Sequence, residues 1–166
     1  MPMPITYVLC AAGEGSRFRA LYPRTPKPLL RLRARSLLEW SLASLPLTAV
    51  DRLVLVTRQE HGVRAALAQV LAAAYPDVEQ VWLEVQALTR GQLETALLAR
   101  EHFLRDAGLA IYNCDTYFES PTLAAAMADP ANAGVVPCSE EPGECWSFCQ
   151  VDEHVEGAER DRVVDI

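Results

Sequence analysis

A turn built from small residues carries the first side chains that could do chemistry. The apolar run at residues 5–10 leads through two alanines into Gly13 and Gly15. Because glycine has no side chain, the backbone amides of such a turn can approach a ligand closely and form an anion-binding nest. Ser16 and Arg17 follow at once and add a hydroxyl and a guanidinium. The turn is therefore predicted to bind phosphate.

Two well-known phosphate-binding loops do not fit this turn. The dinucleotide fingerprint requires a third glycine three residues after Gly15, and Phe18 stands there. A Walker loop requires Gly-Lys-Ser/Thr, which does not follow. The strand expected at residues 53–57 also ends without the acidic residue that binds a ribose. A nicotinamide-dependent oxidoreductase is therefore disfavoured.

A local excess of positive charge surrounds the turn. The chain has a net charge of −7, which argues against a general nucleic-acid binder. Residues 14–35 nevertheless hold seven basic side chains and one acidic one, while residues 139–166 hold nine acidic and two basic ones. Such an excess in an acidic protein indicates a site for a small anion, although a solvated basic loop remains the alternative.

Lys27 is the only lysine in the chain, and the other basic residues are arginines. Lysine is a compact point charge on a flexible stem, whereas arginine is a planar fork. A lysine in an arginine-rich sequence hints at a role that arginine cannot fill.

The elements that must position these residues alternate along the chain. A capping box at Ser36 and Glu39 starts one helix, and Gly108 stands near the expected end of another. The apolar patterns predict strands at 5–10, 52–57, 81–85, 109–113, 134–138, 146–151 and 163–166. They predict helices at 37–45, 60–75, 92–106 and 121–127. This order predicts one domain over residues 1–166 with an α/β fold, a three-layer α/β/α Rossmann-like arrangement around a mostly parallel mixed sheet.

Ligands of such sheets bind beyond the carboxyl ends of the strands. Three loops that leave strands there carry polar or glycine residues: residues 10–27, 86–91 and 113–117. We expect these loops to converge at one edge of the sheet.

The combined motifs resemble a known family. Ala11-Ala12-Gly13-Glu14-Gly15-Ser16-Arg17-Phe18, followed by Pro26-Lys27-Pro28-Leu29-Leu30, is similar to the signature of the sugar-1-phosphate nucleotidyltransferases, which have a glycosyltransferase-A-like fold. Gln86 and Gly91 resemble the family's base-binding positions. Asp115, after Tyr112-Asn113-Cys114, resembles its metal-binding aspartate.

The resemblance implies a reaction in which a sugar 1-phosphate attacks the α-phosphorus of a nucleoside triphosphate and pyrophosphate leaves. Arg17 and Lys27 would be the catalytic residues and would neutralise phosphate charge, and Asp115 would bind Mg²⁺. The nucleotide-binding residues implied are Ala11, Ala12, Gly13, Glu14, Gly15, Ser16, Gln86 and Gly91. The partners implied are a nucleoside triphosphate and a phosphorylated small-molecule acceptor.

Other interpretations stay open at this stage. Asp115 could cap the turn after its strand, and Gln86 could be a solvated loop residue. The acceptor could be a non-sugar phosphate such as choline phosphate, or the chain could be a non-catalytic nucleotide-binding or regulatory module.

The remaining composition limits the setting. Hydrophobic residues make up 51% and charged residues 22%, as in globular proteins, and no apolar run approaches the ~18 residues of a membrane span. No basic segment precedes the first apolar run, so we expect a cytoplasmic protein without a signal peptide. The spacing of Cys138, Cys145 and Cys149 fits no standard zinc pattern, so reduced thiols are expected.

The family's chains continue beyond the position of Ile166, where they carry a second metal-binding aspartate and more of the acceptor pocket. From the sequence we therefore expect this chain to bind a nucleoside triphosphate with Mg²⁺ but to turn over poorly. We also expect a homo-oligomer in which a second copy covers an open sheet edge.

Overall fold

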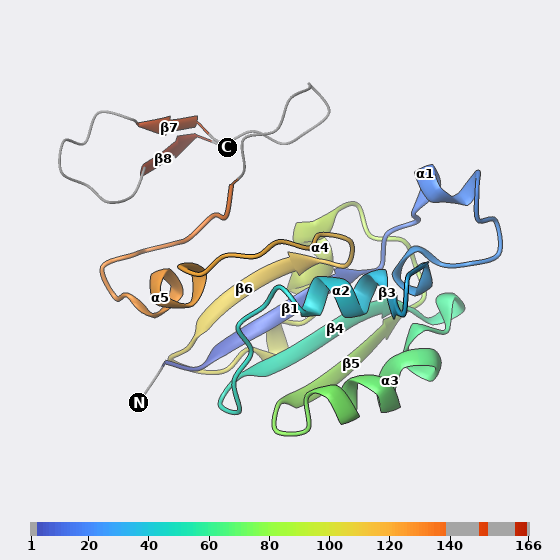
Figure 1. The fold of residues 1–166 in the computed structure, drawn as a ribbon, viewed down its shortest axis with the longest axis horizontal. Helices are drawn as coiled ribbons and strands as arrows, with labels where there is room; N and C mark the ends of the chain where they lie inside the picture. Colours follow the sequence, from blue (N-terminus) through green and yellow to red (C-terminus); the bar gives the residue numbers. More distant parts are fainter. Residues whose placement is uncertain (1–2, 139–149, 153–161, 166) are drawn as a thin grey trace. The chain divides into compact units, whose positions relative to one another are not determined.

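The computed structural model describes residues 3–138, and the backbone of two short strands at 150–152 and 162–165 (Figure 1). The chain divides into two compact units, residues 1–121 and residues 122–166. The expected single domain over residues 1–166 stays a prediction.

The first unit is built on a four-stranded parallel sheet. Its strands are β1 (Ile5–Ala11), β4 (Arg52–Arg58), β5 (Glu79–Val85) and β6 (Gly108–Asn113), in the order β5-β4-β1-β6. β1 lies in the middle, with Cys10 opposite Val56 on one side and Asn113 on the other. These are the four strands predicted in this part of the sequence, so the α/β fold is confirmed. Because all four are parallel, the loops that follow them leave from the same edge.

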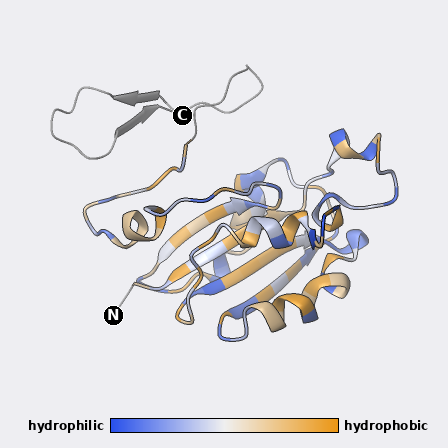
Figure 2. Cartoon of the chain, viewed as in Figure 1, coloured by the Kyte–Doolittle hydropathy of each residue, from blue (hydrophilic) through white to orange (hydrophobic). Residues whose placement is uncertain are grey.

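Helices cover both faces of this sheet, as Figure 1 shows. α2 (Leu37–Leu42) and α3 (Val63–Ala74) lie on one face, and α4 (Gln92–Leu97) lies on the other. On the α4 face, Val8, Val54 and Val56 pack with Ala96 and Ala99 in a buried cluster. Figure 2 shows hydrophobic residues concentrated along the sheet strands, with mixed character along α3. The predicted three-layer arrangement is therefore present.

Short elements complete the first unit. α1 (Ser16–Arg19), η1 (Lys27–Leu29) and the hairpin strands β2 (Arg31–Leu32) and β3 (Arg35–Ser36) lie between β1 and α2. η2 (Gln59–His61) follows β4, and η3 (Arg100–His102) follows α4. Ser36 starts α2 with the predicted capping box: its hydroxyl accepts a hydrogen bond from the Glu39 amide at 3.2 Å.

The predicted helix over 92–106 is wrong in its second half. α4 ends at Leu97. The chain then forms the short 3-10 helix η3, and Phe103 after it has an extended backbone conformation. Side chains from the sheet form hydrogen bonds with the backbone in this stretch. Arg52 donates to the carbonyl of His102 at 2.9 Å, and the Leu104 amide donates to the Thr6 hydroxyl at 2.9 Å. These long-range bonds compete with the helical pattern that the local sequence favours.

Other predicted boundaries also move. α2 ends three residues early, and α3 begins only after η2. In the second unit, α5 (Leu123–Ala128) begins two residues later than predicted, with Thr122 as its N-cap. The strand predicted at 134–138 is not formed in the structure. β7 (Gln150–Asp152) and β8 (Arg162–Asp165) form an antiparallel pair and match parts of the last two predicted strands. Residues 146–149 and 166 lie outside the described residues.

Asp51 joins the starts of two neighbouring strands. It is 4% exposed, and its carboxylate accepts hydrogen bonds from the amides of Ile5 and Thr48 at 2.8 Å and 2.7 Å. The Thr48 hydroxyl donates a third bond at 2.8 Å. The carboxylate therefore holds the start of β1 against the turn before β4.

We predict that Asp51→Ala lowers the free energy of unfolding by about 2–4 kcal/mol, because it leaves buried amide donors without an acceptor. Urea unfolding of the variant measures the loss. The exposed Asp77, which makes no hydrogen bond or ion pair with any described residue, provides the control: Asp77→Ala should change stability by less than about 0.5 kcal/mol. Equal effects of the two variants would show that the Asp51 bonds do not carry the stability.

Candidate active site

The glycine turn after β1 has a conformation that explains Gly15. Its φ is 63°, in the left-handed region that favours glycine, and it caps α1. A Cβ placed there would lie 3.0 Å from the Cβ of Lys27. Nothing lies within 4 Å of a Cβ placed at Gly13. Gly15 is therefore required by the fold itself, and Gly13 is not.

The amides of the turn are available to a ligand. Among the backbone hydrogen bonds of the described residues, none uses the amides of Gly13, Glu14 or Gly15. The carbonyl of Gly15 is used instead, by the amides of Phe18 and Arg19 at 2.9 Å and 3.2 Å. Gly13, Glu14 and Ser16 are exposed, whereas Ala11 and Ala12 are buried. The alanines therefore form the packed floor of the turn and leave its polar backbone facing solvent.

Lys27 and Asp115 form an ion pair that joins two loops of this edge. Lys27 begins η1, and Asp115 lies two residues after β6. The two side chains are 18% and 27% exposed, so the pair is largely shielded but reachable. The Lys27 ammonium also lies 5.5 Å from the centre of the Phe18 ring. The structure thus brings together the predicted glycine turn, lysine and aspartate.

Hydrogen bonds from α2 and its C-terminal turn hold the loop that carries Asp115. The Ser41 hydroxyl donates to the carbonyl of Asn113, and the Phe118 amide donates to the Ser44 hydroxyl at 3.0 Å. These contacts fix the chain on both sides of Asp115. The carboxylate is therefore positioned by the sheet and by α2 rather than by a free loop.

Arg17 does not join this group. It is exposed and makes no hydrogen bond or ion pair with any described residue. Arg19, two residues later, pairs with Glu14 at 3.6 Å between Nη1 and Oε1. The sequence singled out Arg17, whereas the structure shows an ion pair for Arg19.

Gln86 and Gly91 lie on the same edge, at the loop between β5 and α4. Both are exposed, and no described contact links them to Lys27 or Asp115. Gly91 precedes α4 with a φ of 171°, an extended conformation open to any residue. Its carbonyl accepts a hydrogen bond from Thr95 at 3.0 Å. The Cys10 thiol lies 3.7 Å from the carbonyl of Gln92, which sets the start of α4 beside the end of β1.

Glu94 stabilises this loop. Its carboxylate accepts a hydrogen bond from the Arg90 amide and pairs with the Arg90 guanidinium at 3.3 Å. The hydrogen bond from the Arg90 amide lowers the pKa of Glu94. These contacts give Glu94 a structural task at the start of α4.

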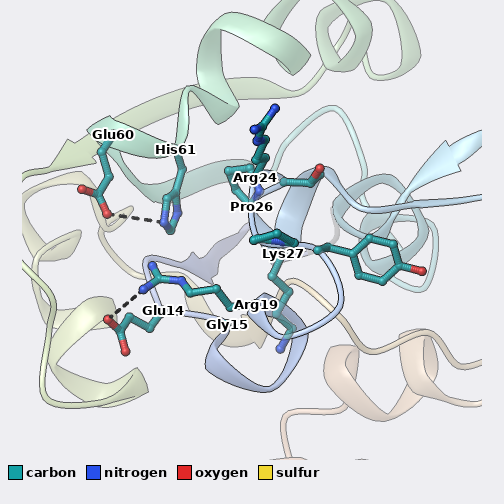
Figure 3. A pocket seen from close by; sticks show the side chains of 11 residues that line it. Glu14, Gly15, Arg19, Arg24, Pro26, Lys27, Glu60 and His61 are labelled. Atoms are coloured by element: carbon teal, nitrogen blue, oxygen red, sulfur yellow. Dashed lines mark ion pairs between the residues drawn. The ribbon is translucent and has the colours of Figure 1, made fainter.

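A cavity of about 190 Å³ opens beside the glycine turn (Figure 3). Its lining includes Gly15 and Lys27 and extends to Arg19, Arg24 and His61. Arg17, Gln86, Gly91 and Asp115 do not line it. Sequence reasoning counted Arg24 only within the basic cluster and assigned nothing to His61. The available signal was the position of His61, three residues after a strand that ends at this edge.

The thiols near the site are not nucleophiles at neutral pH. Burial raises the pKa of Cys10 to about 11 and that of Cys114 to about 12. Both therefore stay protonated, and a thiolate is the reactive form. The charged groups at this edge are therefore better candidates for chemistry than the thiols.

Metal ligands are few in the part of the chain that the structure describes. No group of three or more His, Cys, Asp or Glu side chains is arranged there to hold a metal ion. Asp115 can supply one carboxylate. Magnesium sites that use one or two carboxylates complete their coordination with water and substrate phosphates, so Asp115 fits such a role.

None of the helices in the described residues is long and apolar enough to cross a membrane.

Comparisons with solved structures support the fold. The inositol-1-phosphate CTP transferase from T. maritima has a TM-score of 0.60 and 22% identity over 78% of this chain and 50% of that chain. The nucleoside-diphosphate-sugar pyrophosphorylase from Vibrio cholerae RC9 has a TM-score of 0.70 and 23% identity over 93% of this chain and 64% of that chain. This chain thus spans between half and two thirds of their lengths. A comparison with curated protein sequences finds no match.

The family model of the MobA-like NTP transferase domain matches residues 7–154. The match includes the glycine turn, Lys27, the Gln86 loop and Asp115, so it covers the segments on which the sequence resemblance rested. Because it spans most of the chain, it confirms that resemblance at the level of nucleotidyltransferases: this chain belongs to the family of MobA-like NTP transferase domains.

Proposed function

We propose that this domain transfers a nucleoside monophosphate from a nucleoside triphosphate to a phosphorylated small molecule, with a sugar 1-phosphate as the acceptor. The observation that carries the proposal is the Lys27–Asp115 pair beside the open amides of the glycine turn. An ammonium and a carboxylate side by side offer one group for phosphate oxygens and one for a cation. The family match and the names of the two similar structures support the same chemistry.

In the proposed reaction, a phosphate oxygen of the acceptor attacks the α-phosphorus of the triphosphate. The bond from that phosphorus to the bridging oxygen breaks, and its electron pair leaves with pyrophosphate. Such a transfer depends on positioning and on charge stabilisation rather than on a covalent intermediate with the protein. The amides from Gly13 to Ser16 bind the triphosphate, and Lys27 neutralises charge that develops at the reacting centre.

Asp115 is the residue that would hold Mg²⁺, which supplies further neutralisation of the phosphates when it is bound. Lys27 would then exchange its carboxylate partner for phosphate oxygens. Arg17, which makes no hydrogen bond or ion pair with the described residues, can turn toward the triphosphate from the exposed side. Gln86 and Gly91 read the base, since an amide side chain can both donate and accept hydrogen bonds.

We predict that Lys27→Ala lowers turnover by about two orders of magnitude or more, because it removes a positive charge at the reacting phosphates. A pyrophosphate-release assay, run with each nucleoside triphosphate and a panel of sugar 1-phosphates, measures this. Arg105→Ala is the matched control, at an exposed arginine that precedes β6 whereas Asp115 follows it, and it should keep the wild-type rate.

A double variant separates a ligand role from a fold role. If the pair served only to join two loops, Lys27→Met with Asp115→Asn would keep nucleotide binding, because it removes both charges together. We expect the double variant to lose binding of the magnesium–triphosphate complex by calorimetry while it unfolds near the wild-type temperature. Full binding by the double variant would rule the pair out as a ligand site.

The two glycines of the turn give a further prediction. Gly15→Ala should destabilise the fold by about 1–2 kcal/mol, because alanine is strained at a φ of 63° and meets Lys27. Gly13→Ala should change stability by less than about 0.5 kcal/mol, since nothing lies near its Cβ. If a triphosphate lies on the amides of the turn, Gly13→Ala should still weaken its binding about tenfold or more. Unchanged affinity in Gly13→Ala would contradict the proposed cradle; thermal unfolding and calorimetry read the two effects separately.

A further inference from the structure

The cavity beside the glycine turn has an uncompensated positive charge. Of its acidic lining residues, Glu14 pairs with Arg19, and Glu60 pairs with Arg58 at 2.7 Å. Arg24 makes no hydrogen bond or ion pair with any residue that the structure describes. The cavity therefore presents a guanidinium that no carboxylate of its lining neutralises, which favours an anion.

His61 lines the same cavity, and its ring has a buried nitrogen without a hydrogen-bond partner among the described residues. Its side chain is only 8% exposed, and its Nδ1 is buried without a hydrogen-bond partner among the described residues. Its Nε2 lies 3.7 Å from a carboxylate oxygen of Glu60. A buried nitrogen without a partner is unfavourable, and a small adjustment of the ring beside a ligand oxygen would remove that cost. Figure 3 shows the ring between Glu60 and Arg24, directed into the cavity.

The size of the cavity selects a small ligand. About 190 Å³ is below the roughly 300–1,000 Å³ of sites for larger organic ligands. A space of this size suits a small phosphate anion better than a nucleoside. The cavity also shares Gly15 and Lys27 with the proposed triphosphate cradle, and Asp115 is not part of its lining. It is therefore an extension of that cradle toward the end of β4.

We propose that Arg24 and His61 bind the departing pyrophosphate, and the corresponding β- and γ-phosphates before transfer. This inference rests on the proposed function and adds two residues to its phosphate site. Arg24 donates its guanidinium N–H groups to phosphate oxygens, and an imidazole N–H of His61 donates one more hydrogen bond. When the bond to the α-phosphorus breaks, the negative charge that leaves with pyrophosphate is received by these donors and by Lys27.

Burial lowers the pKa of His61, and the nearby Arg58 cation lowers it further. Glu60 acts in the opposite direction, and Arg19 adds to the lowering. The imidazole is therefore a neutral hydrogen-bond donor at pH 7 rather than a second charge. A neutral donor at this position lets the product leave more readily than a second cation would.

Calorimetric titration with inorganic pyrophosphate in magnesium buffer tests the assignment. We expect Arg24→Gln and His61→Asn each to weaken pyrophosphate binding about tenfold, while the affinity for each nucleoside monophosphate stays within twofold of wild type. Arg105→Gln is the control and should bind pyrophosphate like wild type. Unfolding temperatures are measured in parallel, and Arg24→Gln, at an exposed loop residue, keeps the test decisive if His61→Asn is destabilised.

Three outcomes would overturn the proposal. Wild-type protein without measurable pyrophosphate binding is the first, and pyrophosphate binding unchanged in both variants is the second. The third is a selective loss of sugar 1-phosphate or inorganic phosphate binding, which would assign the cavity to the acceptor. Failure of the proposed function is a different result, namely no transfer from any nucleoside triphosphate, and it leaves the pyrophosphate titration readable.

Discussion

The contact between Lys27 and Asp115 is the constraint on which the site depends. The two residues are far apart in sequence, and they meet because β1 and β6 are neighbours in a parallel sheet, with Cys10 opposite Asn113. The pair ties the long loop after β1 to the short loop after β6. Its side chains are mostly shielded, so the charges interact more strongly than on an open surface. The Lys27–Asp115 ion pair therefore determines both how these two loops are held together and where charge lies at this edge of the sheet.

The sheet could be predicted from the sequence because its strands are short apolar runs bounded by turn residues. The central residues of β1 and β4 are buried, and most of their side chains are apolar. The end of the helix after Gly91 could not be predicted in the same way. Its local pattern remains helical up to residue 106, but Arg52 and Thr6 bind the backbone of residues 102 and 104. Such long-range bonds leave no mark in the local sequence.

In the candidate site, too, some residues could be predicted from the local sequence and others could not. The motif around Gly15 and Lys27 could be predicted from the sequence. A left-handed backbone conformation favours glycine and phosphate binding favours a cation, so the residue types themselves indicate these positions. Arg24 and His61 could not be read, since their significance arises from what surrounds them. The role that we propose for His61 rests on packing, which buries its ring and leaves one nitrogen without a partner among the described residues. The burial of a side chain depends on the whole fold, so the spacing of residues in the sequence could not single out His61.

In the proposed reaction Lys27 must exchange Asp115 for phosphate oxygens, and this exchange suits a lysine better than an arginine. An arginine at this position would face Asp115 with two parallel hydrogen bonds, which are strong and directional. A bound triphosphate would then have to break both before the cation could turn to the phosphates. The lysine ammonium is a single point on a flexible stem, and it can pass from a carboxylate to a phosphate oxygen by rotation of that stem. Its stem is also what packs against Gly15, where a Cβ would approach the Lys27 Cβ to 3.0 Å. The absence of a side chain at Gly15 therefore leaves room for the Lys27 stem. In the proposed complex, the Lys27 ammonium and the open amides of the same turn bind one triphosphate.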